Sequence, residues 1–272
     1  MSLASGPIGV FDSGVGGLSV LRALRAELPY EHFVYVADSG HAPYGERDDK
    51  HVIARSDAIA NYLRDQHQIK TLVVACNTAT AAAIKRLRQD HADLPIIGIE
   101  PALKPAAASS KTGVVGVMAT RSTLQSEKFL ALLATLQGQA RFVLQACDGL
   151  VDAIEREDAI KREALCSYFT GAMGRFGLSD GEMDTLVLGC THYPFVEPEL
   201  RRTIRDTVTL LEGGAPVARQ TRRLLAEKHL LVEPPTVGGG VAFFTTGKAD
   251  MLANAVRRWL QLQAPVSVLQ IN

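Results

Sequence analysis

The chain has 272 residues, and its 29 basic and 29 acidic side chains give a formal net charge of zero. This balance favours a small-molecule substrate over nucleic acid or an anionic membrane as a partner. No signal peptide and no apolar run long enough to span a bilayer is evident, so we expect a cytoplasmic protein. The four cysteines show neither a CxxC pair nor zinc-ligand spacing, so we expect no disulfide and no metal site.

Apolar runs of the β type recur along the chain, and each ends in a polar or glycine-rich turn. In chain order these runs are residues 8–11, 33–37, 71–75, 96–99, 114–119 and 186–189. Helical stretches follow several of them, for example residues 18–27 and the alanine-rich stretch up to residue 87. Near-continuous apolar strands separated by helices predict an α/β fold with mostly parallel sheets. In such sheets, ligands bind at the carboxyl ends of the strands.

Two stretches of the sequence resemble each other. Residues 72–78 read LVVACNT and residues 186–192 read LVLGCTH, so each is an apolar strand that leads to a cysteine and two polar residues. This similarity predicts two similar domains, each presenting one cysteine at a strand end, with the site in the cleft between them. We expect residues 1–99 plus 211–272 to form the first domain and residues 100–210 the second.

Cys76 and Cys190 are the cysteines that we expect to act chemically, because each follows a strand among hydroxyl, amide and imidazole groups. The N–H groups of a following helix would stabilise a thiolate at either position. Inverting an α-carbon requires one group that removes a proton and a second group that delivers a proton to the opposite face. Two such cysteines meet this requirement, whereas Cys147 and Cys166 lie in apolar patterns typical of buried residues.

Other polar residues near the strand ends complete the expected site. Asp12 ends the first strand and His192 lies two residues after Cys190, so both could assist proton transfer. The turn at residues 14–17 does not match a nucleotide-binding motif, but its N–H groups could hold a carboxylate. Short polar groups suited to a carboxylate and an ammonium are Asn77, Thr78 and Thr191, and the 43–45 turn adds the phenol or backbone of Tyr44. No lysine stands at these strand ends, so pyridoxal phosphate is not required and we expect no cofactor.

The chemistry of these residues leaves other functions open. A cysteine hydrolase could use Cys190 with His192, although it would leave Cys76 without a role. A non-catalytic module that binds an amino acid could use the same polar groups.

Four motifs of the chain resemble those of the aspartate/glutamate racemase superfamily, and in particular of the glutamate racemases. They are residues 8–18, residues 35–38 with 43–45, residues 75–79 and residues 189–194, and the resemblance extends from residue 7 to about residue 225. It implies interconversion of L- and D-glutamate without a cofactor, to supply D-glutamate for peptidoglycan. Racemases of this kind are often homodimers. The alternative that the chain is a racemase of the same superfamily acting on aspartate or a hydantoin stays open, since backbone and hydroxyl contacts do not set the length of the distal acid.

The resemblance also implies roles for individual residues. Cys76 would handle the proton of the D-enantiomer and Cys190 that of the L-enantiomer, assisted by Asp12, His192 and Glu155. Substrate contacts would fall on Asp12, Ser13, Tyr44, Gly45, Asn77, Thr78, Thr120, Thr191 and His192. The chain departs from the family pattern at residues 38–41, 147–148 and 212–214, which bear on loop geometry more than on the chemistry.

Overall fold

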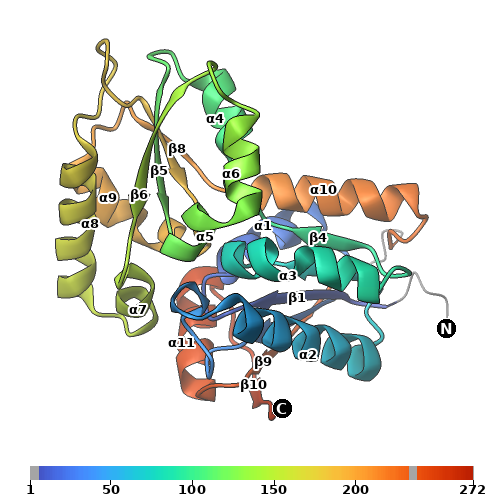
Figure 1. Ribbon diagram of the computed structural model, residues 1–272. Helices are drawn as coiled ribbons and strands as arrows, with labels where there is room; N and C mark the ends of the chain where they lie inside the picture. Colours follow the sequence, from blue (N-terminus) through green and yellow to red (C-terminus); the bar gives the residue numbers. More distant parts are fainter. Residues whose placement is uncertain (1–5, 233–237, 272) are drawn as a thin grey trace. The chain divides into compact units, whose positions relative to one another are not determined.

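The computed structural model describes residues 6–232 and 238–271, and the chain divides into two compact units (Figure 1). The first unit comprises Met1–Ile99 and Gly214–Asn272, and the second comprises Glu100–Gly213. The chain returns to the first unit at Gly214 rather than at residue 211, because the last strand of the second unit ends at Leu211. Among the described residues, no helix is both long and apolar enough to cross a membrane.

The first unit is built on a sheet of parallel strands in the order β10-β9-β2-β1-β3-β4. These strands are β1 (Ile8–Asp12), β2 (Phe33–Ala37), β3 (Thr71–Val74), β4 (Ile96–Gly98), β9 (Val241–Thr245) and β10 (Val266–Val268). Its helices are α1 (Leu18–Glu27), η2 (Tyr44–Glu46), α2 (Asp49–His67), α3 (Asn77–Asp90), α10 (Gly214–Glu227) and α11 (Ala249–Leu260). Strands β1, β2 and β3 are buried along their whole length, which explains why their sequences are continuously apolar.

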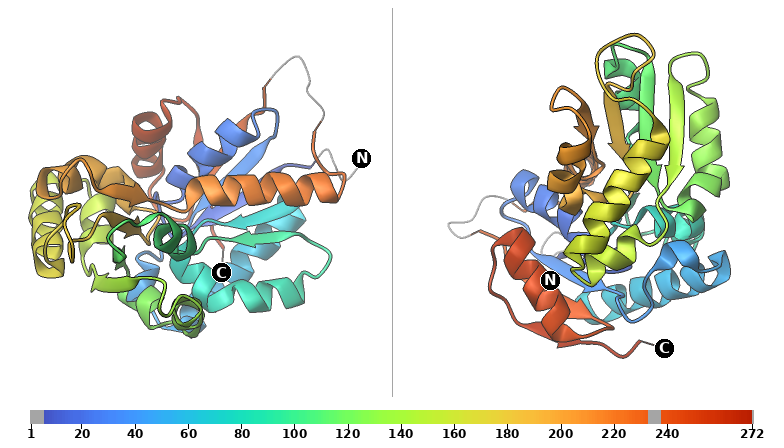
Figure 2. Two further views of the ribbon diagram at one scale, coloured as in Figure 1. Left: turned by 90° about the horizontal axis from the view of Figure 1, so that it is seen from above. Right: turned by 90° about the vertical axis from the view of Figure 1, so that its left-hand side faces the viewer.

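The core of the first unit lies between its sheet and its helices. Side chains of α2 and α3 pack with Phe11, Val34 and Val74 in one buried cluster. Helix α1 packs with α10 and α11, and the two views in Figure 2 show helices on both faces of the sheet. Strands β9 and β10 were not expected from the sequence, and both are only partly buried.

The second unit contains a smaller parallel sheet in the order β6-β5-β7-β8. Its strands are β5 (Val114–Ala119), β6 (Arg141–Ala146), β7 (Thr185–Leu188) and β8 (Thr209–Leu211). Its helices are α4 (Leu103–Ser109), α5 (Arg121–Gln125), α6 (Glu127–Ala134), α7 (Leu150–Glu155), α8 (Ala159–Met173), η3 (Tyr193–Val196) and α9 (Glu197–Thr203). Residues of α4 and α6 pack with Val115, Val117 and Val187 on one face, while Met173 of α8 approaches Gly116 on the other.

The two sheets share one strand order. The order β2-β1-β3-β4 in the first unit corresponds to β6-β5-β7-β8 in the second. Cys76 follows β3 and Cys190 follows β7, so the two cysteines leave corresponding strands of the two units. The expected α/β fold with mostly parallel, helix-flanked sheets is therefore confirmed.

Candidate active site

The candidate site residues of the first unit lie at the carboxyl ends of β1 and β3 and in η2, which follows β2. We call them the Cys76 cluster: Asp12, Ser13, Tyr44, Gly45, Cys76, Asn77 and Thr78. Cys76 is the N-cap of α3, and its Sγ accepts the N–H of Ala79 at 3.4 Å. Its Sγ also lies 3.7 Å from Ser13 Oγ, because β1 and β3 are adjacent parallel strands that end side by side. A sulfur at a helix N-terminus that accepts a backbone N–H is suited to the thiolate form.

A tight turn holds Asp12 in one orientation at the end of β1. The side chain of Asp12 is fully buried, and its Oδ1 accepts the N–H of Gly14 at 2.8 Å. The hydroxyl of Tyr35 donates to Gly14 O, also at 2.8 Å. A Cβ at position 17 would lie only 2.6 Å from Asp12 Cβ and 2.9 Å from Tyr35 Oη, so the close approach requires Gly17. The turn therefore places a carboxylate on the strand next to the one that leads to Cys76.

The hydroxyl of Tyr44 is hydrogen-bonded to Asp38, a residue that was not expected in the site from the sequence. The hydroxyl of Tyr44 donates to Asp38 Oδ2 at 2.6 Å, and the tyrosine is 1% exposed. Burial and the nearby Asp38 charge raise the pKa of Tyr44, so its hydroxyl stays protonated. The phenol therefore cannot donate a hydrogen bond to a ligand, which leaves the backbone of the 43–45 turn, including that of Gly45, to do so.

Asn77 and Thr78 are the first two residues of α3, and both are buried. The Oδ1 atom of Asn77 is buried and has no hydrogen-bond partner among the described residues. An unpaired buried acceptor costs free energy, so Asn77 is available to a donor group of a ligand.

The second unit contributes a chain of three polar groups, which we call the Cys190 cluster: Cys190, His192 and Glu155. His192 Nδ1 lies 3.7 Å from Cys190 Sγ, and His192 Nε2 lies 2.6 Å from Glu155 Oε1 on α7. Burial by itself lowers the pKa of His192, but its hydrogen bonds with Cys190 and Glu155 raise that pKa well above its ordinary value. The geometry thus favours a protonated imidazole between a sulfur and a carboxylate.

The surroundings of Cys190 differ from those expected. Cys190 does not stand at a helix N-terminus, because the chain turns once more, with Tyr193 N donating to Cys190 O, before the short helix η3 begins. The expectation of support from helix N–H groups is therefore wrong for Cys190. The imidazole of His192, whose Nδ1 lies 3.7 Å from Cys190 Sγ, supports the sulfur instead. Thr191 is buried between the two residues.

Thr120 occupies the carboxyl end of β5, where it is the N-cap of α5. Its Oγ1 accepts the N–H of Thr123 at 3.3 Å and donates to Thr123 Oγ1 at 2.8 Å.

Cys147 and Cys166 are buried, and burial raises the pKa of both, to about 12 for Cys166. These two thiols therefore stay protonated near neutral pH, as suits core residues.

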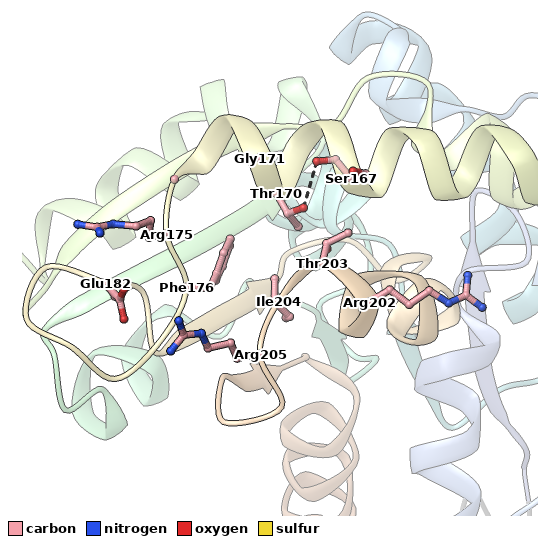
Figure 3. Close-up of a pocket in the computed structure, with 11 residues that line it drawn as sticks. Ser167, Thr170, Gly171, Arg175, Phe176, Glu182, Arg202, Thr203, Ile204 and Arg205 are labelled. Carbon is pink, nitrogen blue, oxygen red and sulfur yellow. Dashed lines mark hydrogen bonds between the residues drawn. The ribbon is translucent and has the colours of Figure 1, made fainter.

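A separate cavity of about 630 Å³ lies in the second unit (Figure 3). It is lined by Ser167, Thr170, Gly171, Gly174, Arg175, Phe176, Glu182, Arg202, Thr203, Ile204 and Arg205. None of the residues expected from the sequence lines it, and Figure 3 shows Arg175 and Arg202 pointing in opposite directions. The cavity is thus not the candidate site.

Within residues 6–232 and 238–271, no group of three His, Cys, Asp or Glu side chains could hold a metal ion.

The chain is similar to known proteins over nearly its whole length. The sequence model of the Asp/Glu/Hydantoin racemase family matches residues 8–221. A glutamate racemase of Ectopseudomonas mendocina (strain ymp) is 46% identical over 268 residues, which cover 98% of this chain and 100% of the relative. Among solved structures, a glutamate racemase isoform of Bacillus anthracis superimposes with a TM-score of 0.85 at 32% identity, over 97% of each chain. The Escherichia coli glutamate racemase, solved with L-glutamate and the activator UDP-MurNAc-ala, gives a TM-score of 0.81 at 29% identity, over 98% of this chain and 99% of that one.

Proposed function

The chain belongs to the Asp/Glu/Hydantoin racemase family, and we propose that it interconverts L- and D-glutamate without a cofactor. The observation that carries this proposal is the equivalence of β3 and β7, each of which leads to a buried cysteine among polar groups. The choice of glutamate is supported by relatives of that name that are 43% to 48% identical.

In the proposed mechanism, each unit supplies one thiol that works on one face of the α-carbon. With D-glutamate, the Cys76 thiolate removes the α-proton, and the electron pair of the C–H bond stays on the α-carbon, delocalised into the carboxylate. The Cys190 thiol then donates a proton to the other face, which yields L-glutamate, a Cys76 thiol and a Cys190 thiolate. The reverse reaction starts from this protonation state, and proton exchange with solvent also restores the first one.

The neighbours of each sulfur would assist these transfers. Asp12 holds a fixed carboxylate at the end of the strand beside the one that leads to Cys76, and the protonated imidazole of His192 favours the thiolate of Cys190. Glu155 stabilises that imidazole through its 2.6 Å contact. The substrate would be bound by the short polar groups and backbone around the two sulfurs: Ser13, Tyr44, Gly45, Asn77, Thr78, Thr120 and Thr191.

Replacing each cysteine in turn tests this mechanism. We expect Cys76→Ser and Cys190→Ser each to slow racemisation by on the order of 10²- to 10⁴-fold, because a hydroxyl is a far weaker general base than a thiolate. Circular dichroism of D- and L-glutamate measures the rate, and incorporation of solvent deuterium at the α-carbon reports proton transfer. Cys166→Ala is the matched control, because this buried cysteine has no role in the proposal and should leave the rate unchanged.

A cysteine hydrolase is the second candidate, because Cys190, His192 and Glu155 form a thiol–imidazole–carboxylate chain. That function would tolerate Cys76→Ser and would produce a covalent acyl-enzyme detectable by mass spectrometry. Turnover of aspartate or a hydantoin without turnover of glutamate would instead point to a different racemase. Absence of deuterium incorporation with every substrate would indicate simple binding.

We also propose a biological setting for the reaction. The product D-glutamate would serve peptidoglycan synthesis in the cytoplasm, and the protein would act as a homodimer. Labelling of the cell wall by isotopic L-glutamate, lost when the protein is depleted, tests the first point. Sedimentation of the purified protein tests the second.

A further inference from the structure

Arg55 on α2 is a charged side chain that lies almost wholly inside the first unit, with 8% of its side chain exposed. Its Nε donates to Asp38 Oδ2 and its Nη2 to Asp38 Oδ1, each at 3.0 Å. Its Nη1 donates to the carbonyl of Ile271 at 2.8 Å. Burying an ion pair brings little net stability compared with apolar residues, so a pair this well satisfied calls for another explanation.

Asp38, at the end of β2, receives hydrogen bonds from three different segments of the chain. Oδ1 accepts from Thr246, directly after β9, at 2.8 Å, and Oδ2 accepts from Tyr44 at 2.6 Å. With the two bonds from Arg55, both carboxylate oxygens are fully occupied. Burial by itself raises the pKa of Asp38, but the hydrogen bonds from Arg55, Tyr44 and Thr246 lower it below its ordinary value. Asp38 therefore stays charged, and the hydroxyl of Tyr44 has one direction in which to point.

Tyr44 connects this network to the reacting sulfur. Tyr44 and Cys76 belong to the same buried cluster, and helix η2 packs against α3, whose N-cap is Cys76. The position of the 43–45 turn beside Cys76 thus depends on the hydrogen bond from the Tyr44 hydroxyl to Asp38. Arg55, in turn, sets the position of Asp38.

We infer that Arg55 is a positioning residue for proton transfer at Cys76, acting through Asp38 and Tyr44 to hold the 43–45 turn against the sulfur. This inference rests on the proposed function. It assigns a role to a side chain of α2 and to the segments around Thr246 and Ile271, which come from distant parts of the sequence.

The test exploits the symmetry of racemisation. Because the two enantiomers have equal free energy, kcat/KM is the same in both directions for every variant, and only isotope effects reveal which proton transfer is slow. Deuterium at the α-carbon of D-glutamate reports proton removal by Cys76, and deuterium in L-glutamate reports removal by Cys190. For Arg55→Lys we expect kcat/KM to fall by on the order of 10- to 100-fold, the cost of a misplaced reacting group. The isotope effect should rise with deuterated D-glutamate and fall with deuterated L-glutamate.

A double-mutant cycle tests the route of the effect. If Arg55 acts through the phenol, Arg55→Lys should add little to Tyr44→Phe. Thr246→Val removes another donor to Asp38 and should shift the two isotope effects in the same directions as Arg55→Lys. If Arg55→Lys fails to fold, Thr246→Val tests whether the network around Asp38 positions the 43–45 turn. The control is Lys70→Met, which breaks the buried Lys70–Glu31 pair (2.6 Å) at the opposite end of β3 and should leave both isotope effects at their wild-type values.

The outcomes separate this inference from the proposed function. A wild-type protein that racemises no glutamate would overturn both. A wild type that racemises glutamate, with variants whose two isotope effects do not diverge, would overturn the positioning role alone. The same divergence in Lys70→Met would also overturn it, because loss of stability would then explain the effect.

Discussion

Glu155→Gln is the substitution that most directly probes the electrostatics of the Cys190 cluster. The amide keeps the size of the side chain but removes the negative charge 2.6 Å from His192 Nε2. His192 is 2% exposed, so water cannot replace the lost charge. Because Glu155 is one of the groups that raise the pKa of His192, that pKa should fall in the variant.

The size of the fall follows from the two kinds of hydrogen bond. A hydrogen bond to a charged group contributes about 1.5–3 kcal/mol and a neutral one about 0.5–1.5 kcal/mol, so the preference for the protonated imidazole drops by about 1–1.5 kcal/mol. The pKa of His192 therefore falls from its raised position toward its ordinary value. The thiolate of Cys190 then loses part of its cationic partner, and we expect kcat to fall by about tenfold.

Stability should respond to pH with a definite sign. The pKa of His192 in the folded protein lies above its ordinary value of 6.5. Its protonated form therefore stabilises the fold fully below about pH 6.5, and this contribution disappears as the pH rises through the folded-state pKa. The difference in free energy of unfolding between wild type and Glu155→Gln should be widest near pH 6 and should close at alkaline pH.

Urea denaturation between pH 5.5 and 9.5 measures this difference, and nitrogen-15 NMR of the histidine rings follows the titration of His192. Asp152→Asn is the matched control, because Asp152 lies on the same helix but pairs with the exposed Arg156 and Lys161. If His192 titrates at the same pH in wild type and Glu155→Gln, or if the stability difference does not vary with pH, the assigned electrostatics are wrong.

Three further predictions concern packing and reactivity. Gly17→Ala should destabilise the fold by about 1–3 kcal/mol, measured by urea denaturation, and lower racemisation, because the new Cβ collides with Asp12 and Tyr35. Asp184→Ala should lower the free energy of unfolding by about 2–4 kcal/mol in the same assay, since the Asp184 carboxylate accepts hydrogen bonds from the 110–112 loop. Hydrogen bonds lower the pKa of Asp184 despite its burial, so this loss of stability should shrink as the solution is acidified through the carboxyl range. Cys166 should react with a thiol reagent at pH 8 only after unfolding, because it is fully buried and burial raises its pKa to about 12; rapid labelling of the native protein at this position would contradict its place in the core.

Features that depend on neighbouring residues could be predicted from the sequence. A strand buried on both faces must be apolar along its length, so β1, β2, β3, β5 and β7 were evident as runs of apolar residues. The polar residue that follows such a run must lie at a strand end, which located Asp12, Cys76 and Cys190. Asp38 carries the same signal at the end of β2 and could have been found in this way.

Features that depend on distant residues required the tertiary structure. Nothing in the local sequence of α2 shows that Arg55 reaches Asp38 and Ile271, because the latter is 216 residues away. The partly buried strand β9 joins the sheet by pairing with β2, a strand about 200 residues earlier, and β10 joins it by pairing with β9. The raised pKa of the imidazole beside Cys190 likewise depends on Glu155, which is 37 residues from His192 in the sequence. Apolar patterning thus determined the fold class and placed Cys76 and Cys190 at strand ends, whereas long-range packing decided which groups surround each sulfur.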